Sequence, residues 1–381
     1  MSSAVIAQPV PVPYVRSGPR VEVVSDHAAL LRLKPAWDEL VAQAGVEHPF
    51  LGHEWTSTWW ECFGAGKELH VLLVRDGARL VALAPLMRSE TRMYGLRVRR
   101  LGSLYNPHVP RSDFLVARGA QDACRALWRH LRDAERGWDV LELCQLPPHS
   151  PALTELPALA RADGFLTGAW SAPGSPYLPI AGSWADYRGR LRAKHRSNLR
   201  NRLKRIGRLG EVELEVVSSA DGLARALEDG FRLEAAAWKG KAGTAIDTSP
   251  ELRLFYTRLA QRMASCGRLR LHFLSLDGRR IAFGYSLFHE RRLYLLKPGY
   301  DPKYAHLSPS GLLVLKVLEH AFQQGLAEHD FLGVDDAWKL EWTDALRPHR
   351  WLYVFSRSAR AALLHALKFR IVPALRWFSP S

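Results

Sequence analysis

A polar segment in the C-terminal half of the chain has the residue types and spacing that could bind a phosphate group. Ser308-Pro309-Ser310-Gly311 separates an expected strand from a long apolar helical pattern. We expect Ser308 to cap this helix and Pro309 to occupy its first turn. The next three amides, those of Ser310, Gly311 and Leu312, would then point outward and could bind phosphate together with the helix dipole. An ordinary capped helix is the alternative interpretation.

Acidic residues after the next expected strand could remove a proton from an amine. Asp335 and Asp336 follow the run Asp330-Phe331-Leu332-Gly333, and α/β proteins place their chemistry at the carboxyl ends of strands. A carboxylate in this position could act as a general base, directly or through water. The alternative is that these acids are surface residues paired with Lys339.

A helix in the same half brings one acid and one tryptophan onto a common face. Glu234 and Trp238 are one helical turn apart, so their side chains are neighbours. They could line a substrate cleft. The alternative interpretation is that Trp238 belongs to the core.

The densest run of positive charge lies on a helix expected to begin at the capping box Ser183–Asp186 and to end at Gly207. Its apolar stripe from Tyr187 to Ile206 marks the face that packs. The basic residues are Arg188, Arg190, Arg192, Lys194, Arg196, Arg200, Arg202, Lys204, Arg205 and Arg208. They could bind RNA, a phosphorylated substrate or acidic lipid, or form a solvated helix face. The run lacks interleaved aromatic residues, so sequence-specific RNA recognition is not expected.

The candidate residues belong to the second of two similar halves of the chain. His70 to Leu86 and Leu271 to Leu287 each contain a β-prone run, an Asp-Gly turn and a second β-prone run. Each half predicts the order strand, helix, hairpin, strand, helix, strand. That order favours an α/β (α+β) fold class with a mixed sheet in each unit.

We therefore predict two tandem units between two tails. Residues 1–18 are expected to form a disordered tail, residues 19–182 the first unit and residues 183–356 the second. Residues 171–177 are rich in Pro, Gly and Ser, which predicts a loop that joins the units. Residues 357–381 form a basic amphipathic tail that could lie on an acidic membrane surface or pack on the second unit.

Composition narrows the class of protein and its partners. The chain has 381 residues, a net charge of +15 and 47% hydrophobic residues, which indicates a globular protein that favours anionic partners. Its four cysteines show no pairing pattern, its start does not resemble a signal peptide, and no apolar run is long enough to span a membrane. We therefore expect a cytoplasmic protein. His48 and His53 lack the spacing of a zinc pair, so no metal is expected.

Several segments together resemble a known bacterial family. They are His48-Pro49-Phe50, Ala84-Pro85-Leu86, Glu234 to Trp238, Lys297 to Asp301, Ser308 to Gly311 and Asp330 to Lys339. From about Val21 to Phe355 the chain is similar to the BioF2-like acetyltransferase domain, a group that includes proteins associated with cellulose and exopolysaccharide biosynthesis. That group is related to the Fem-type aminoacyltransferases, which also pair two GNAT-like units.

The resemblance implies an acyl-CoA-dependent N-acyltransferase of the GNAT type, with two tandem GNAT-like domains and its site in the second. Acetyl-CoA or a longer acyl-CoA would place its pyrophosphate at Ser308 to Leu312. A backbone amide near Phe283 to Ser286 or Leu293 to Leu296 would hold the oxyanion. The first unit has Ser103-Leu104-Tyr105-Asn106 where the second has its Ser-Pro-Ser-Gly segment. It would therefore be degenerate, serving as a scaffold or as the acceptor-binding half.

The resemblance also implies roles for individual side chains. The amine acceptor, a small molecule or a sugar, would lose its proton to Asp335, Asp336 or Glu234. Tyr300 or Tyr304 would protonate the leaving thiolate. The implied substrate-binding residues are Trp238, Lys297, Asp301 and Lys339.

Two other functions remain open. The basic helix and the kinship with Fem-type enzymes suggest aminoacyl transfer from a charged tRNA. The basic tail would also suit a non-catalytic partner of a membrane-bound polysaccharide synthase, peripherally associated with the inner membrane face.

Overall fold

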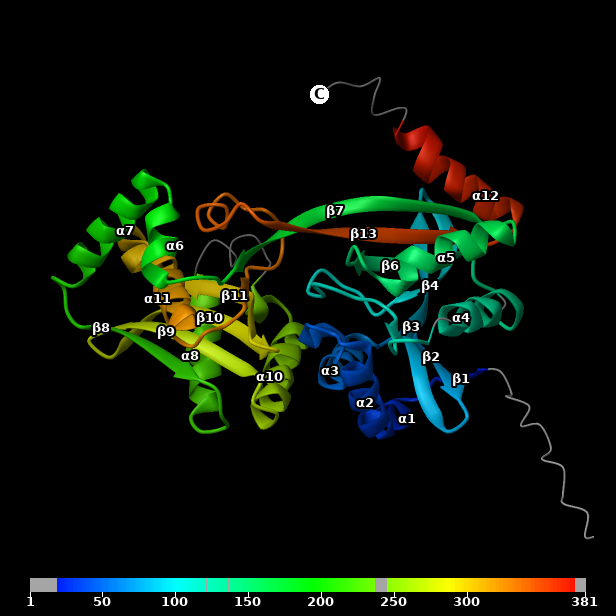
Figure 1. Cartoon of the computed structure of the whole chain (residues 1–381), viewed down its shortest axis with the longest axis horizontal. Coiled ribbons are helices and arrows are strands. Elements are labelled where there is room, and N and C mark those ends of the chain that lie inside the picture. The colour runs from blue at the N-terminus through cyan, green and yellow to red at the C-terminus, as the bar shows by residue number, and fades with distance from the viewer. Residues whose placement is uncertain (1–18, 121, 136, 237–244, 374–381) are drawn as a thin grey trace, which may run out of the picture.

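Two similar repeats of helices and strands lie side by side in the computed structural model, which describes residues 19–120, 122–135, 137–236 and 245–373 (Figure 1). The first repeat contains β1 (Arg20–Val24), α1 (His27–Arg32), α2 (Lys34–Ala44), α3 (His53–Phe63), β2 (Glu68–Asp76), β3 (Arg79–Met93), β4 (Leu96–Ser103), α4 (Asp122–Asp133) and β6 (Val140–Leu146). The second contains β8 (Val212–Val217), α8 (Leu223–Ala236), α10 (Pro250–Ser265), β9 (Leu269–Leu276), β10 (Arg279–His289), β11 (Arg292–Tyr300), α11 (Pro309–Gln323) and β12 (Glu328–Asp330). The predicted repeat of elements is confirmed.

Each repeat contains the hairpin that its Asp-Gly pair predicts. In the second, Leu276 pairs with Arg279, and the turn residues Asp277 and Gly278 have φ values of 47° and 73°. Such left-handed conformations suit a two-residue turn between twisted strands. In the first, Asp76 itself pairs with Arg79, so the turn begins one residue later, at Gly77.

The described strands form one 13-stranded sheet, in which the strand order is β1-β2-β3-β4-β6-β13-β7-β12-β11-β10-β9-β8 and β5 (Leu115–Val116) pairs with β3. Two long strands, β7 (Leu166–Pro179) and β13 (Leu346–Phe355), join the repeats and run side by side across the molecule (Figure 1). Residues 346–355 follow the second repeat in the chain, but β13 pairs with β6 of the first.

The predicted loop over residues 171–177 was wrong, because these residues lie inside β7. Their Pro, Gly and Ser content is typical of a loop, but β13 supplies a strand partner from a distant part of the chain. The ladder has a register shift between Arg347 and His349, opposite this proline-containing stretch. Irregular positions of this kind tolerate proline in a strand.

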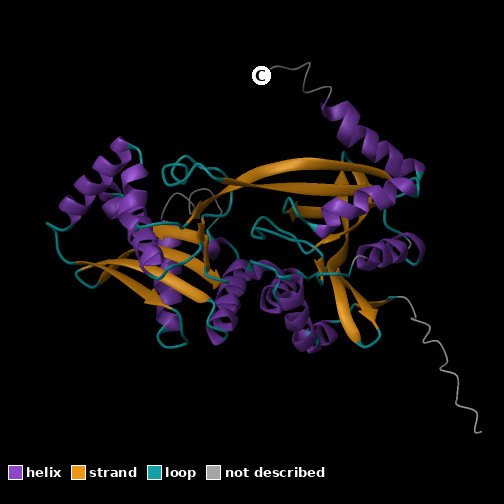
Figure 2. Ribbon diagram, viewed as in Figure 1, coloured by secondary structure: helices purple, strands orange, loops and turns teal. Residues whose placement is uncertain are grey.

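Helices cover both faces of the strands in the second repeat (Figure 2). Phe273 and Phe283 point to the face covered by α8 and α10, in a cluster that also contains Trp55 and Trp59 of α3. Leu274 and its neighbours point to the opposite face, where they pack with α11. The alternation follows the two-residue period of a strand.

The basic segment forms two helices, α6 (Trp184–Arg190) and α7 (Ala193–Ile206), instead of the single helix that we predicted. The predicted cap is confirmed, since the Ser183 hydroxyl accepts a hydrogen bond from the Asp186 amide at 3.1 Å. The break falls at Leu191, whose extended backbone lets its buried side chain reach the core.

The described part of the C-terminal tail packs on the protein. The helix α12 (Ala359–Ala366) and the turn after it contact β7 and β13, and the Phe369 ring lies near Trp170 and Tyr353. Across the described ranges, none of the helices is both long and apolar enough to cross a bilayer.

Candidate functional site

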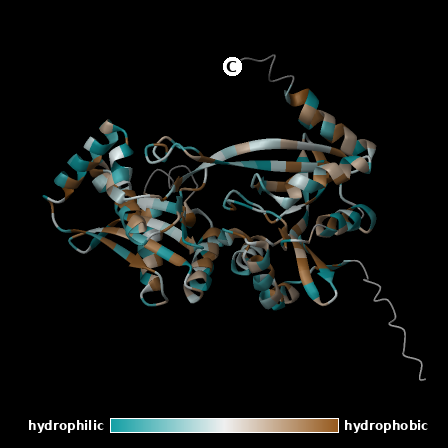
Figure 3. Cartoon of the chain, viewed as in Figure 1, coloured by the Kyte–Doolittle hydropathy of each residue, from teal (hydrophilic) through white to brown (hydrophobic). Residues whose placement is uncertain are grey.

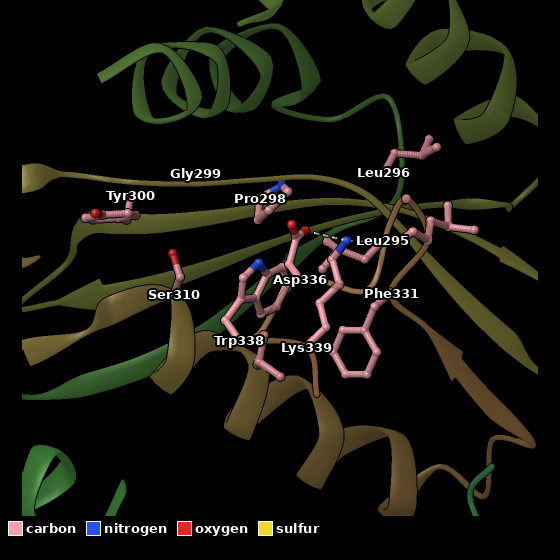
Figure 4. Close-up of a pocket in the computed structure, with 13 residues that line it drawn as sticks. Leu295, Leu296, Pro298, Gly299, Tyr300, Ser310, Phe331, Asp336, Trp338 and Lys339 are labelled. Atoms are coloured by element: carbon pink, nitrogen blue, oxygen red, sulfur yellow. Dashed lines mark hydrogen bonds and ion pairs between the residues drawn. The ribbon is translucent and has the colours of Figure 1, made fainter. Parts of the chain in front are cut away.

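The strands β11 and β12 part in the second repeat and leave a cavity between them. They pair in parallel only from Arg292 to Tyr294, because β12 ends at Asp330 while β11 continues to Tyr300. The opening holds a cavity of about 310 Å³, which we call the cleft cavity (Figure 4). It is lined by Leu295, Leu296, Pro298, Gly299, Tyr300, Ser310, Val314, Phe331, Leu332, Gly333, Asp336, Trp338 and Lys339.

A β-bulge shapes the wall of the cleft cavity. Leu295 lies opposite Ser286 and Lys297 lies opposite Tyr285, so Leu296 has no residue opposite it on β10. Bulges of this kind bend a strand and redirect its groups, and they recur beside active sites. Leu296 falls within one of the two stretches in which we expected an oxyanion-binding amide.

The start of α11 forms one end of the cleft cavity. Pro309 occupies the first turn, as predicted, but the expected side-chain cap by Ser308 was wrong, because Ser308 is left-handed at φ 52°. Its carbonyl accepts a hydrogen bond from the Leu312 amide at 3.1 Å, so Leu312 is not a free donor. The amides of Ser310 and Gly311 have no acceptor among the described residues.

Positive charge lies beside this helix start. The Arg202 guanidinium, on α7, is 4.0 Å from the position that a Cβ on Gly311 would occupy. The basic helix therefore reaches the place where two backbone donors are available, and both features favour an anion.

The loop after β12 forms the opposite wall and is held in a strained shape. Leu332 has a φ of 52°, which is unfavourable for a residue with a branched side chain. The Asp330 carboxylate accepts a hydrogen bond from the Leu332 amide at 2.8 Å. Lys339 donates to the carbonyls of Leu332 and Val334 at 2.9 and 2.8 Å and pairs with Asp336 at 2.9 Å (Figure 4). These contacts fix the loop against the cavity.

A second cavity of about 290 Å³ lies between the repeats, and we call it the inter-repeat cavity. It shares Leu296, Leu332 and Gly333 with the cleft cavity, so the two meet at the bulge and the strained loop. Its remaining walls are Tyr105, Pro107, His108, Val109, Pro110, Gln145, Pro173, Ser175, Tyr256, Lys297, Val334 and His349. The bulge and the strained loop therefore form a wall that both cavities share.

Ionisable groups in and behind the inter-repeat cavity have shifted pKa values. Burial lowers the pKa of Lys297, although the Glu234 carboxylate, 3.9 Å away, partly opposes the shift. Burial, with a smaller effect of the Arg111 charge, lowers the pKa of His349 to about 4. The His349 imidazole is therefore neutral at pH 7 and can accept a hydrogen bond.

The structure brings only some of the predicted site residues together. Tyr300, Ser310, Asp336 and Lys339 line the cleft cavity, and Lys297 lines the inter-repeat cavity. The others that are described line neither cavity and are Glu234, Asp301, Tyr304, Ser308, Gly311, Leu312 and Asp335. Trp238 lies outside the described residues.

Hydrogen bonds and exposure show where the predicted residues outside the two cavities lie. Glu234 is fully buried and accepts a hydrogen bond from the Ile246 amide at 2.8 Å. Asp301 caps a short 3-10 helix, Pro302–Leu307, which carries Tyr304, and it accepts from the Lys303 amide at 3.0 Å. Asp335 is exposed on the loop.

Sequence reasoning missed most of the apolar lining of the cleft cavity and, apart from Lys297, did not single out the polar side chains of the inter-repeat cavity. One signal was available, because a proline inside a β-prone run marks a strand without a complete set of partners. Pro298 is such a residue, and it lies where β11 has left β12. The inter-repeat cavity has no local signal, since its walls come from residues as distant as Tyr105 and His349.

Comparison with known proteins agrees with this geometry. The sequence model of a family described as "Acetyltransferase (GNAT) domain" matches residues 193–340. No curated protein gives a match to the chain.

Solved structures share the whole fold at low identity. FemX superposes with a TM-score of 0.59 at 13% identity, over 86% of this chain and 98% of FemX. The C-terminal DUF2156 domain of a putative lysylphosphatidylglycerol synthetase from Agrobacterium fabrum superposes with a TM-score of 0.51 at 13% identity. The match covers 90% of this chain and 96% of that domain. A protein of unknown function from Bacteroides thetaiotaomicron superposes with a TM-score of 0.50 at 12% identity, over 88% of this chain and 100% of that protein.

The chain thus has a mixed α/β fold of two tandem GNAT-like units. The matching family supports acyl transfer as its general chemistry, and the match covers the repeat that contains the cleft cavity.

Proposed function

We propose that the protein is an acyl-CoA-dependent N-acyltransferase that acts at the cleft cavity. The observation that carries the proposal is the cavity itself, which lies between parted strands and ends at the start of α11. The amides of Ser310 and Gly311, with the nearby Arg202 guanidinium, would bind the pyrophosphate of the donor. The thioester would then extend along β11 toward Leu296.

The amine acceptor would enter through the inter-repeat cavity. That cavity meets the cleft cavity at Leu296 and is lined by polar groups of both repeats, including Lys297 and His349. The Ser175 hydroxyl is buried there without a hydrogen-bond partner among the described residues, so it is available to an acceptor hydroxyl. A polar amine such as an amino sugar suits this lining, in keeping with a role in exopolysaccharide or envelope biosynthesis.

The reaction would form an amide bond and break the thioester. The amine nitrogen attacks the thioester carbon, a backbone amide at the bulge stabilises the developing oxyanion, and the carbon–sulfur bond breaks. Of the carboxylates considered as the base, Asp336 lines the cleft cavity, and Tyr300 lies there to protonate the thiolate. Because the enzyme would hold the amine and the thioester next to each other, the reaction would lose less translational and rotational entropy in reaching the transition state.

Calorimetry with acetyl-CoA and longer acyl-CoAs tests the proposal. Ser310→Glu should lower the affinity at least about tenfold, because its carboxylate would repel the pyrophosphate. The variant should still fold, since an acid near a helix N-terminus is favoured by the helix dipole. Gln323→Glu, which adds the same charge at the other end of α11, is the matched control. Failure of the wild type to bind any of these esters would overturn the proposal.

Aminoacyl transfer from a charged tRNA is the second candidate, because the basic residues of α6 and α7 are largely exposed. Figure 3 shows hydrophilic colour over much of these helices. This candidate predicts tRNA binding that weakens steeply as salt is raised. Filter binding at low salt tests it, and absence of tRNA retention there would remove it.

A further inference from the structure

A third, much smaller cavity lies under α11, where β11 and β12 begin to part. Its volume is about 20 Å³, and it shares Leu295, Pro298, Ser310 and Val314 with the cleft cavity. The rest of its lining is His272, Phe283, Gly284, Ser286, Leu313, Val317 and His329. We call it the vertex cavity. It continues the cleft cavity toward the core, which is where the end of a bound acyl chain would lie.

Two side chains of the vertex cavity are buried with unmet hydrogen-bonding capacity. Ser286 and His329 are each 1% exposed. The Ser286 hydroxyl and both ring nitrogens of His329 have no partner among the described residues. Ser286, on β10, and His329, on β12, lie opposite Leu295 and Leu293 of β11, respectively. These leucines pack with α11, so Ser286 and His329 belong to the sheet face that α11 covers.

Such groups are uncommon in a packed core, because burying a polar atom without a partner destabilises the folded protein. Three unpaired atoms around one cavity therefore indicate that something polar enters it. The volume exceeds the roughly 10–15 Å³ that one water-sized group needs, so it fits one oxygen atom and little more.

The lining also excludes some kinds of polar group. The cavity has no Lys or Arg among its lining residues, and its other walls are largely apolar. Burial keeps the two histidines uncharged at neutral pH, with the pKa of His272 lowered to about 3 and that of His329 to about 4. An ionised carboxylate would be buried here without a counter-charge, and the free energy lost by removing it from water would oppose its binding. A neutral hydroxyl or carbonyl oxygen fits.

We propose that the donor is a short acyl-CoA whose acyl chain carries a hydroxyl or keto oxygen, and that this oxygen binds Ser286 and His329 in the vertex cavity. The inference rests on the proposed function and adds the class of acyl group. A hydroxyl can donate to a ring nitrogen of His329 and accept from the Ser286 hydroxyl, whereas an alkyl chain would leave both side chains unpaired.

Paired ligands test this proposal. We expect 3-hydroxybutyryl-CoA to bind at least about tenfold more tightly than butyryl-CoA by calorimetry, since an apolar ligand leaves the buried polar groups unsatisfied. Ser286→Ala should reduce that ratio toward one, mainly by weakening the hydroxylated ester. Binding of neither ester would overturn the proposed function as well. Equal binding of both by the wild type would overturn the present inference alone.

A stability measurement without ligand gives an independent readout. Ser286→Ala should leave the melting temperature unchanged or higher, because it removes an unpaired hydroxyl. The control is Ser103→Ala in the first repeat, where the Ser103 hydroxyl accepts hydrogen bonds from the Cys144 amide at 3.3 Å and from Ser112 at 3.1 Å. That variant should melt lower and keep the acyl preference. If Ser286→Ala lowered the melting temperature as much as Ser103→Ala does, a resident water would be hydrogen-bonded to the Ser286 hydroxyl, and the proposal would be overturned.

Discussion

Arg111, in the first repeat, and Asp330, at the end of β12, form a buried ion pair where the repeats meet. Asp330 is fully buried and also pairs with Arg347 of β13. Its other carboxylate oxygen accepts the Leu332 amide of the strained loop. One side chain therefore connects the first repeat, the shared strand β13 and the wall common to both cavities.

Replacing Asp330 by Asn should destabilise the protein by about 3–5 kcal/mol, because the buried Arg111 guanidinium would lose its counter-charge and the partly buried Arg347 would keep only its pair with Glu328. Urea unfolding measures the change. Asp344→Asn is the control, since the Asp344 side chain is 92% exposed and its pair with Arg192 spans 3.7 Å. It should cost less than about 1 kcal/mol. An equal loss in the free energy of unfolding of both variants would show that the buried ion pairs of Asp330 stabilise the protein no more than an exposed pair does.

Gly299→Ala should separate β11 from α8 and distort the cleft cavity. A Cβ at Gly299 would lie 2.5 Å from the Glu234 Cα and 2.6 Å from its amide nitrogen, and a backbone cannot yield as a flexible side chain can. We expect a loss of about 1–3 kcal/mol, as for overpacked cores, and weaker acyl-CoA binding. Thermal unfolding and calorimetry measure the two effects.

Gly174→Ala is the matched control for this substitution. It also lies in a strand, and its nearest atom, the Leu346 Cβ, would be 3.4 Å from the new methyl group, an ordinary contact. This variant should keep nearly full stability and binding. A Gly299→Ala protein that behaves like it would contradict close packing of β11 on α8.

Stability should fall as the pH is lowered from 6.5 toward 5. Burial lowers the pKa of His272, His329 and His349 to about 3, 4 and 4, whereas histidine in an unfolded chain titrates near 6.5. In this window the unfolded chain binds more protons than the folded protein, so acid favours unfolding. Well above pH 6.5, where these histidines are neutral in the unfolded chain too, the three groups add no pH dependence.

Urea unfolding at pH 7.5, 6.5 and 5.5 checks this expectation. His329→Gln and His349→Gln should each reduce the slope of the free energy of unfolding against pH, since glutamine does not titrate. A slope that is unchanged in both variants would mean that other groups control the acid sensitivity.

Local signals explain how much of the fold could be predicted from the sequence. The Asp277-Gly278 pair fixes a hairpin because few other residues adopt two successive left-handed conformations. Pro309 and the apolar pattern after it located the start of α11. The pairing of β7 with β13 could not be predicted, because residues 171–177 resemble a loop until a distant strand pairs with them.

The site was predictable only where one short segment builds it. Ser310, Tyr300, Asp336 and Lys339 all lie within or next to segments with recognisable composition, and all line the cleft cavity. The Leu296 bulge and the left-handed Ser308 have no composition that reveals them, since tertiary packing imposes both. The walls of the inter-repeat cavity depend on how the two repeats assemble.

The position of β13 constrains how the protein can be made. While the ribosome is still synthesising the second repeat, β6 and β7 lack the strand that later lies between them. Their open edges would offer unpaired amides and carbonyls to other chains, a known route to aggregation. The N-terminal part therefore has to wait for residues 346–355 before its sheet is complete. A nascent chain that stalls before that point would keep these two strand edges unpaired, even if its first 180 residues had collapsed.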